Sequence, residues 1–206
     1  MTLLSRLLRC DRAASAAEFA IVLPLLLIFL FGIIDGGRFL WEYNRAEKAT
    51  QMGVRFAAVA DPVATALEGP QAGGYSFSVS DGITQCSTDP TANFDNSVCT
   101  STTCSCTGGG ICGSIGHDVN AFNRIVARMA VFYPAIGQSN VSITYKNVRL
   151  GFAGDPVNPN VSPLVTVKLS GLTFQPITCL VFACSISMPD FRAALTAEDL
   201  SGKTSY

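Results

Sequence analysis

The side chains that most often carry chemistry are few in this sequence, apart from its cysteines. Among 206 residues there is one histidine, His117, the only side chain of the kind that usually acts as a base near neutral pH. No serine lies in a G-x-S-x-G nucleophile motif, and the carboxylates are scattered rather than paired. We therefore expect a protein that is not an enzyme and that needs no cofactor.

Eight cysteines are the remaining reactive groups. Their spacing fits neither a zinc ribbon nor a Cys2His2 finger, so no metal site is predicted. Cys10 stands apart near the N-terminus, and Cys179 and Cys184 form a C-x4-C pair that is typical of a local staple. Apart from Cys10 the cysteines number seven, an odd number, so one is free, bonds another chain, or pairs across the two groups. The spacing leaves the connectivity open. These disulfide candidates are Cys86, Cys99, Cys104, Cys106, Cys112, Cys179 and Cys184.

The overall composition is apolar and nearly neutral. Hydrophobic residues make up 49% of the chain and charged residues only 14%, which excludes an intrinsically disordered protein. Lys and Arg total 14 against 15 Asp and Glu, so the chain lacks the basic surplus of a nucleic-acid binder.

The apolar excess is concentrated near the N-terminus. Residues Phe19–Ile34 carry no charge, and the small residues before them extend the segment to Ala13–Ile34, 22 residues or about 33 Å of helix. No A-x-A cleavage site follows, which argues against a cleaved secretory signal. A basic flank with arginines at positions 6, 9 and 12 predicts that the N-terminus is cytoplasmic and that the chain after Ile34 is exported.

The apolar pattern continues beyond this segment as one stripe of an amphipathic helix, which Asp61-Pro62 should end. We therefore predict a single helix over Ala14–Ala60, about 70 Å long, with a local kink at Pro24. Gly32 and Gly36 form a GxxxG motif, which indicates either close helix pairing or flexibility near the membrane exit.

The rest of the chain has short alternating segments and dense turn residues. Strands are expected at residues 75–79, 141–145 and 165–169, with further strands within 177–188 and 191–195. A second helix is expected over Asp118–Phe132, capped by Asp118, with an apolar stripe of Val119, Phe122, Val126, Met129 and Tyr133. The predicted fold class is α+β: a long membrane-spanning helix that continues into a small domain with an antiparallel sheet and a second helix.

These expectations divide the chain into three parts. The first part, residues 1–13, is a cytoplasmic leader. The second is the long helix over residues 14–60, which is transmembrane over 14–36 and amphipathic over 37–60. The third is the exported domain, residues 61–206. Within that domain, 81–114 should be a cysteine-rich loop, because its apolar residues are too few to form a core. It is either a stapled surface insertion or a contact surface for other proteins.

The N-terminal segment resembles a known family. The residues that carry the resemblance are a basic stretch, a run of small residues, Glu18-Phe19-Ala20, an L-P-L-L-L motif around Pro24, and a G-x-R-x-A-A motif from Gly53 to Ala58. Over Ala13–Ala60 the sequence is similar to the TadE/TadG-like pseudopilins of tight-adherence (Tad, or Flp-type) pilus systems.

The resemblance implies a pilin-like fold and processing by a prepilin peptidase that cuts five residues before a glutamate. The cut would fall between Ala13 and Ala14, and Glu18 would become the fifth residue of the mature chain. Ala13 stands where the family has glycine, and TadG-like members also keep an uncleaved anchor, so both forms remain open. A carboxylate in an apolar segment is costly and is therefore a candidate functional residue.

Three functions are compatible with these observations. The first, implied by the resemblance, is a minor pilin that takes part in assembling a Tad adhesion pilus. Its partners would be other Tad components, a sister minor pilin, membrane lipid and the prepilin peptidase. It would be a single-pass protein of the bacterial inner membrane with a periplasmic domain. The second is a permanently anchored scaffold of the secretion machinery, and the third is a surface adhesin that uses the cysteine-rich loop.

Overall fold

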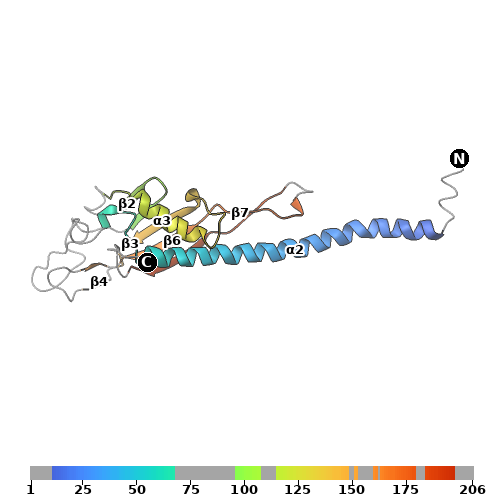
Figure 1. Cartoon of the computed structure of the whole chain (residues 1–206), viewed down its shortest axis with the longest axis horizontal. Coiled ribbons are helices and arrows are strands. Elements are labelled where there is room, and N and C mark those ends of the chain that lie inside the picture. The colour runs from blue at the N-terminus through green and yellow to red at the C-terminus, as the bar shows by residue number, and fades with distance from the viewer. Residues whose placement is uncertain are drawn as a thin grey trace, which may run out of the picture. The chain divides into compact units, whose positions relative to one another are not determined.

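The computed structural model describes residues 11–67, 96–107, 115–148, 151–152, 160–161, 163–179 and 184–197. They fall into two compact units, one comprising residues up to Glu42 with Thr173–Ser187, the other comprising Tyr43–Leu172 with the residues from Met188 onward. The predicted α+β class is confirmed: the chain has a long apolar helix, a second helix and an antiparallel sheet (Figure 1). The strand expected at 75–79 lies outside the described residues.

The long helix, α2, spans Asp11–Ala57, 47 residues. It begins and ends three residues earlier than the predicted Ala14–Ala60. The early end has a local cause, because the carbonyl of Phe56 accepts hydrogen bonds from both Val59 N–H and Ala60 N–H and tightens the last turn. The helix is continuous through Pro24.

A five-stranded antiparallel sheet forms the framework of the second unit. Its spatial order is β2-β1-β3-β6-β9. Six residue pairs, from Val141↔Leu169 to Lys146↔Leu164, join β3 and β6 in antiparallel register. The strands are β1 (Asn96–Cys99), β2 (Cys104–Thr107), β3 (Val141–Lys146), β6 (Leu164–Leu169) and β9 (Phe191–Thr196). The expected strands at 141–145, 165–169 and 191–195 are thus confirmed.

Alternating residues of this sheet form the core. Val141, Ile143 and Tyr145 of β3 are buried, as are Val165 and Val167 of β6, because successive side chains of a strand point to opposite faces. Tyr145 is fully buried, and its hydroxyl accepts a hydrogen bond from Val63 N–H at 3.0 Å. Burial raises the pKa of this phenol, so it stays neutral and hydrogen-bonded.

The second helix, α3, spans Val119–Ala130. Asp118 caps it as predicted: one carboxylate oxygen accepts hydrogen bonds from Asn120 N–H at 2.7 Å and Ala121 N–H at 3.2 Å. Phe122, Val126 and Met129 are buried as the stripe predicts. The prediction that Val119 belongs to this stripe is wrong, because its side chain is 50% exposed at the first position of the helix. Ile125, which was not in the predicted stripe, is fully buried.

The prediction of a loop over 81–114 is wrong for its central part. Residues 96–99 and 104–107 are strands, and β1 lies between β2 and β3. Ser97 and Cys99 are fully buried although the segment is polar. Backbone hydrogen bonding to two neighbours, rather than apolar content, incorporates β1 into the sheet.

The described residues also contain smaller elements. Within the range 177–188, where a strand is expected, the described residues contain the short strand β8, and Ile177 and Thr178 form a turn. The remaining elements are η1 (Thr65–Leu67), η4 (Gln138–Asn140), β4 (Gly151–Phe152) paired with β5 (Asn160–Val161), and β7 (Thr173–Phe174) paired with β8 (Ile186–Ser187).

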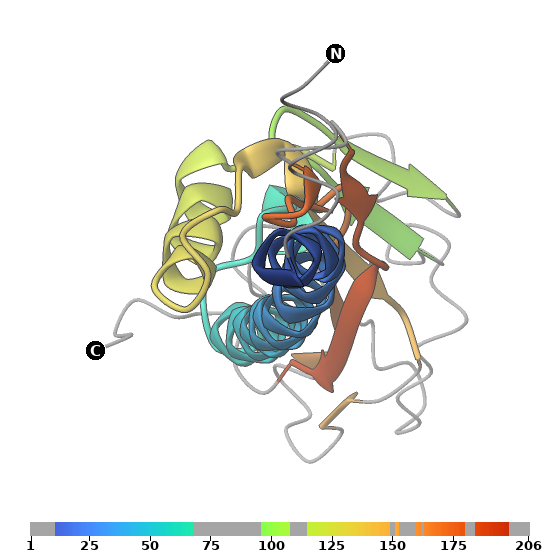
Figure 2. The ribbon, with the colours of Figure 1, turned by 90° about the vertical axis from the view of Figure 1, so that its right-hand side faces the viewer.

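The end of α2 that begins at Tyr43 packs on both α3 and the sheet. Figure 2 shows α3, in yellow, and β9, in red, on different sides of the teal end of α2. The Arg45 Nε–H donates to the Phe132 carbonyl at 2.9 Å, and the Tyr43 and Phe191 rings meet edge to face with centroids 4.9 Å apart. Buried residues recur along this stretch at helical spacing: Ala46, Ala49, Thr50, Gly53, Val54 and Ala57.

Gly53 permits the close approach of α3. A β-carbon at this position would lie 2.7 Å from Met129 Cγ and 2.8 Å from Met129 Sδ. We predict that Gly53→Val lowers the free energy of unfolding by about 1–3 kcal/mol, because overpacking forces the helices apart. Urea unfolding of the full chain in detergent micelles measures this loss. Lys48→Val, at an exposed position of the same helix, controls for the helix propensity of valine, and an equal loss in both variants would contradict the packing.

Candidate functional site

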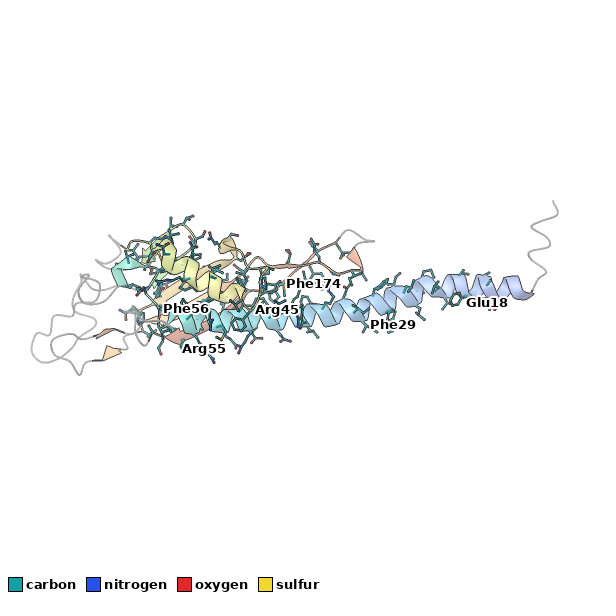
Figure 3. All side chains as sticks on the ribbon, viewed as in Figure 1. Glu18, Phe29, Arg45, Arg55, Phe56 and Phe174 are labelled. Atoms are coloured by element: carbon teal, nitrogen blue, oxygen red, sulfur yellow. A yellow bond between two sulfur atoms is a disulfide. The ribbon has the colours of Figure 1, made fainter. Side chains whose placement is uncertain are left out.

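The N-terminal half of α2 has an apolar surface that no other described element covers. Its apolar side chains from Phe19 to Ile34 are exposed, with Ile21 at 76% and Phe29 at 70%. Figure 3 shows Glu18 and Phe29 on this part of the helix. By length and composition it is the one helix among the described residues that could cross a membrane. Exposed apolar surfaces of this extent mark contact sites for a membrane or for other proteins.

The residues predicted for processing and helix packing all lie on this helix. Ala13 and Ala14 are in its first turns, and Glu18 follows one turn after Ala14 with its side chain exposed. Gly32 and Gly36 are exposed, and a β-carbon at either would meet nothing within 4 Å. This open, small-residue surface leaves room for a second helix.

Asp35 is the polar centre of the first unit. It follows directly after the apolar segment and is only 6% exposed. Oδ1 accepts a hydrogen bond from Ile177 N–H at 2.7 Å, and Oδ2 accepts from Thr178 N–H and Thr178 Oγ1–H, both at 2.9 Å. Arg38 Nη1 lies 3.4 Å from Oδ1. One carboxylate therefore ties the helix to a turn 142 residues later.

That turn belongs to a hairpin, which we define as residues 173–179 and 184–187. The Phe39 and Phe174 rings meet edge to face at 5.4 Å, and the Arg38 guanidinium lies 5.4 Å from the Phe174 ring centroid. Phe174 thus pairs with helix position 39, and Thr178 with position 35. The chain after β7 runs along the helix toward the apolar segment.

A disulfide closes this hairpin. Cys179 and Cys184, expected as a local staple, are bonded, with their Cα atoms 4.8 Å apart. The bridge follows immediately after the Thr178 contact, so it links the arm that Asp35 holds to the returning arm that begins at Cys184.

Sequence reasoning missed the role of Asp35. A carboxylate that directly follows a long apolar segment is nevertheless a signal in the sequence. The acceptor role depends on two backbone N–H groups far along the chain, and no local pattern identifies them.

Three of the other predicted cysteines, Cys99, Cys104 and Cys106, lie in strands β1 and β2. Cys99 and Cys104 form a disulfide across the β1–β2 turn, and Cys106 is also disulfide-bonded. Cys86 and Cys112 lie outside the described residues. His117 Nε2 is 2.9 Å from the Thr100 carbonyl oxygen, and the described residues contain no cluster of three or more potential metal ligands.

Residues 13–55 match the family model of the TadE-like proteins. This is the family that the sequence resembles, and the matched stretch covers most of α2. No match was found among curated proteins or among solved structures. The match associates the chain with Tad pilus assembly and with Tad pilus components in general terms.

Proposed function

We propose that this protein is a minor pilin-like, single-pass membrane protein that takes part in assembling a Tad adhesion pilus. The observation that carries the proposal is the TadE-like match over a helix whose N-terminal half exposes a membrane-length apolar surface. The work of such a protein is packing rather than catalysis: its helix joins others in the membrane, and its folded unit docks to neighbouring components.

The orientation follows from charge. Arginines precede the apolar segment at positions 6, 9 and 12, so the N-terminus should remain in the cytoplasm and the sheet should be periplasmic. The disulfides support this orientation, because disulfides form and persist in an oxidising compartment such as the bacterial periplasm.

Deletion of the gene for this protein in its native cell tests the proposal. We expect pili counted by electron microscopy to fall and surface attachment to fall with them, and expression of the full chain in trans to restore both. Unchanged pilus number and length in the deletion strain would contradict a role in assembly. A protease-protection assay on intact spheroplasts checks the orientation independently, since the sheet should be digested from outside.

The alternative is a permanently anchored scaffold of the same machinery. The presence of Ala13 where the family has glycine favours it, because the peptidase pattern is incomplete. N-terminal sequencing of the protein purified from membranes separates the two: a chain that starts at Ala14 supports the pilin, and an intact leader supports the scaffold.

A further inference from the structure

We propose that the hairpin of residues 173–179 and 184–187 is a second membrane contact, which inserts into the lipid headgroup layer on the exported side. The proposal rests on the membrane-spanning helix of the proposed function and adds a lipid-binding surface to it. Its partner is the phospholipid surface itself.

The position of the hairpin along the helix is the first step of the argument. The segment Ser15–Ile34 has 20 residues, about 30 Å of helix, which matches the hydrocarbon core of a bilayer. Asp35 therefore lies at the edge of that core. Its three hydrogen bonds hold Ile177 and Thr178 at the same level.

The extent of the hairpin is the second step. Phe174 pairs with Phe39, four residues or about 6 Å along the helix from Asp35. The headgroup layer on each side of a bilayer is roughly 5–8 Å thick. The described hairpin thus spans this layer, and the Cys179–Cys184 bridge lies at the end nearer the hydrocarbon core.

The chemistry of the hairpin fits this environment. No charged residue occurs between Lys168 and Asp190, and the sequence between the two bridged cysteines is entirely apolar. Ile186 is 46% exposed on β8. The Arg38 guanidinium lies at the level of the lipid phosphates, with its side chain 42% exposed and paired with the carboxylates of Asp35 at 3.4 Å and Glu42 at 4.0 Å. The Asp35 carboxylate is only 6% exposed and enclosed by its hydrogen-bond donors, so it is hidden from those phosphates.

Depth-dependent quenching in vesicles tests the proposal. The full chain carrying Trp41→Phe, which removes its only tryptophan, receives Ile186→Trp and is reconstituted in phosphatidylethanolamine–phosphatidylglycerol vesicles. Ile186 pairs with Phe174 at the level of Phe39 in the headgroup layer, so we expect lipids that carry a nitroxide quencher on the headgroup to quench this tryptophan strongly. Phe29→Trp in the same background, within the apolar segment, should be quenched by bromines deep in the acyl chains.

The two probes separate the possible failures. If Phe29→Trp is quenched by lipid while Ile186→Trp is quenched only by aqueous acrylamide, the hairpin contact with lipid is contradicted and the membrane-spanning helix is supported. If neither probe responds to its lipid quencher, both the spanning helix and the hairpin contact are contradicted. Protection of Ile186→Trp that grows with the protein-to-lipid ratio would identify a second protein copy as the partner and overturn the lipid contact.

Variants of the clamp test how the hairpin is held. Asp35→Ala removes all three acceptor contacts and should abolish the lipid quenching of Ile186→Trp while leaving that of Phe29→Trp unchanged. Thr178→Val removes only the hydroxyl donor and should cause a smaller loss. Full lipid quenching in Asp35→Ala would show that the carboxylate does not hold the hairpin in the headgroup layer.

Discussion

Replacing Phe122 by alanine should lower the free energy of unfolding of the unit that contains α3 by about 3–5 kcal/mol. Phe122 is fully buried on α3, beside Ile125 and Met129, which are fully buried on the same helix. Truncating its ring removes apolar contacts and leaves a cavity that the neighbouring backbone fills only in part. Because domains are stable by only about 5–15 kcal/mol, this loss is large enough to unfold a substantial fraction of the protein.

Urea unfolding of the full chain in detergent micelles, followed by near-ultraviolet circular dichroism, measures this loss. Val119→Ala is the matched control, because Val119 begins the same helix and is 50% exposed. We expect the control to change the free energy of unfolding by no more than about 0.5 kcal/mol. Similar losses in the two variants would contradict the packing of α3 against the core.

Periodicity in the sequence was sufficient for the helices and the central strands. The amphipathic stripe predicted the buried side of α2 beyond the apolar segment, and the alternating segments predicted β3 and β6. These patterns succeed because the buried face of each element is specified by its own residues. The predicted helix ends were less accurate, because the hydrogen bonds to the Phe56 carbonyl that close the last turn leave no signature in residue type.

Contacts between residues far apart in the chain could not be predicted from the periodicity of the sequence. The segment Asn96–Cys99 is too polar and short to predict as a strand, and only its pairing with β2 and β3 makes it one. The contact of Asp35 with Ile177 and Thr178 depends on backbone donors, which every residue other than proline possesses. Residue type therefore indicates that Asp35 needs partners without identifying them.

Replacing Glu18 by alanine should leave membrane insertion intact and strongly reduce the number of pili. A carboxylate within a membrane helix costs about 2.5–3.5 kcal/mol, so its removal favours insertion rather than opposing it. Glu18 is exposed on α2, four residues after Ala14, and residues at this spacing lie on the same helical face. If the peptidase cuts before Ala14, the new ammonium group and the carboxylate neutralise each other within one chain or between stacked neighbours.

Membrane fractionation and electron microscopy of the same cells measure the two effects. Glu18→Gln keeps the size of the side chain and removes its charge, so it should resemble Glu18→Ala if charge pairing is what matters. Glu47→Ala is the matched control, since Glu47 is an exposed carboxylate on the same helix beyond the apolar segment, and it should leave pilus number unchanged. Normal piliation in Glu18→Ala would exclude this role for the carboxylate. A loss of pili in Glu18→Ala but not in Glu18→Gln would assign the effect to side-chain packing instead of charge.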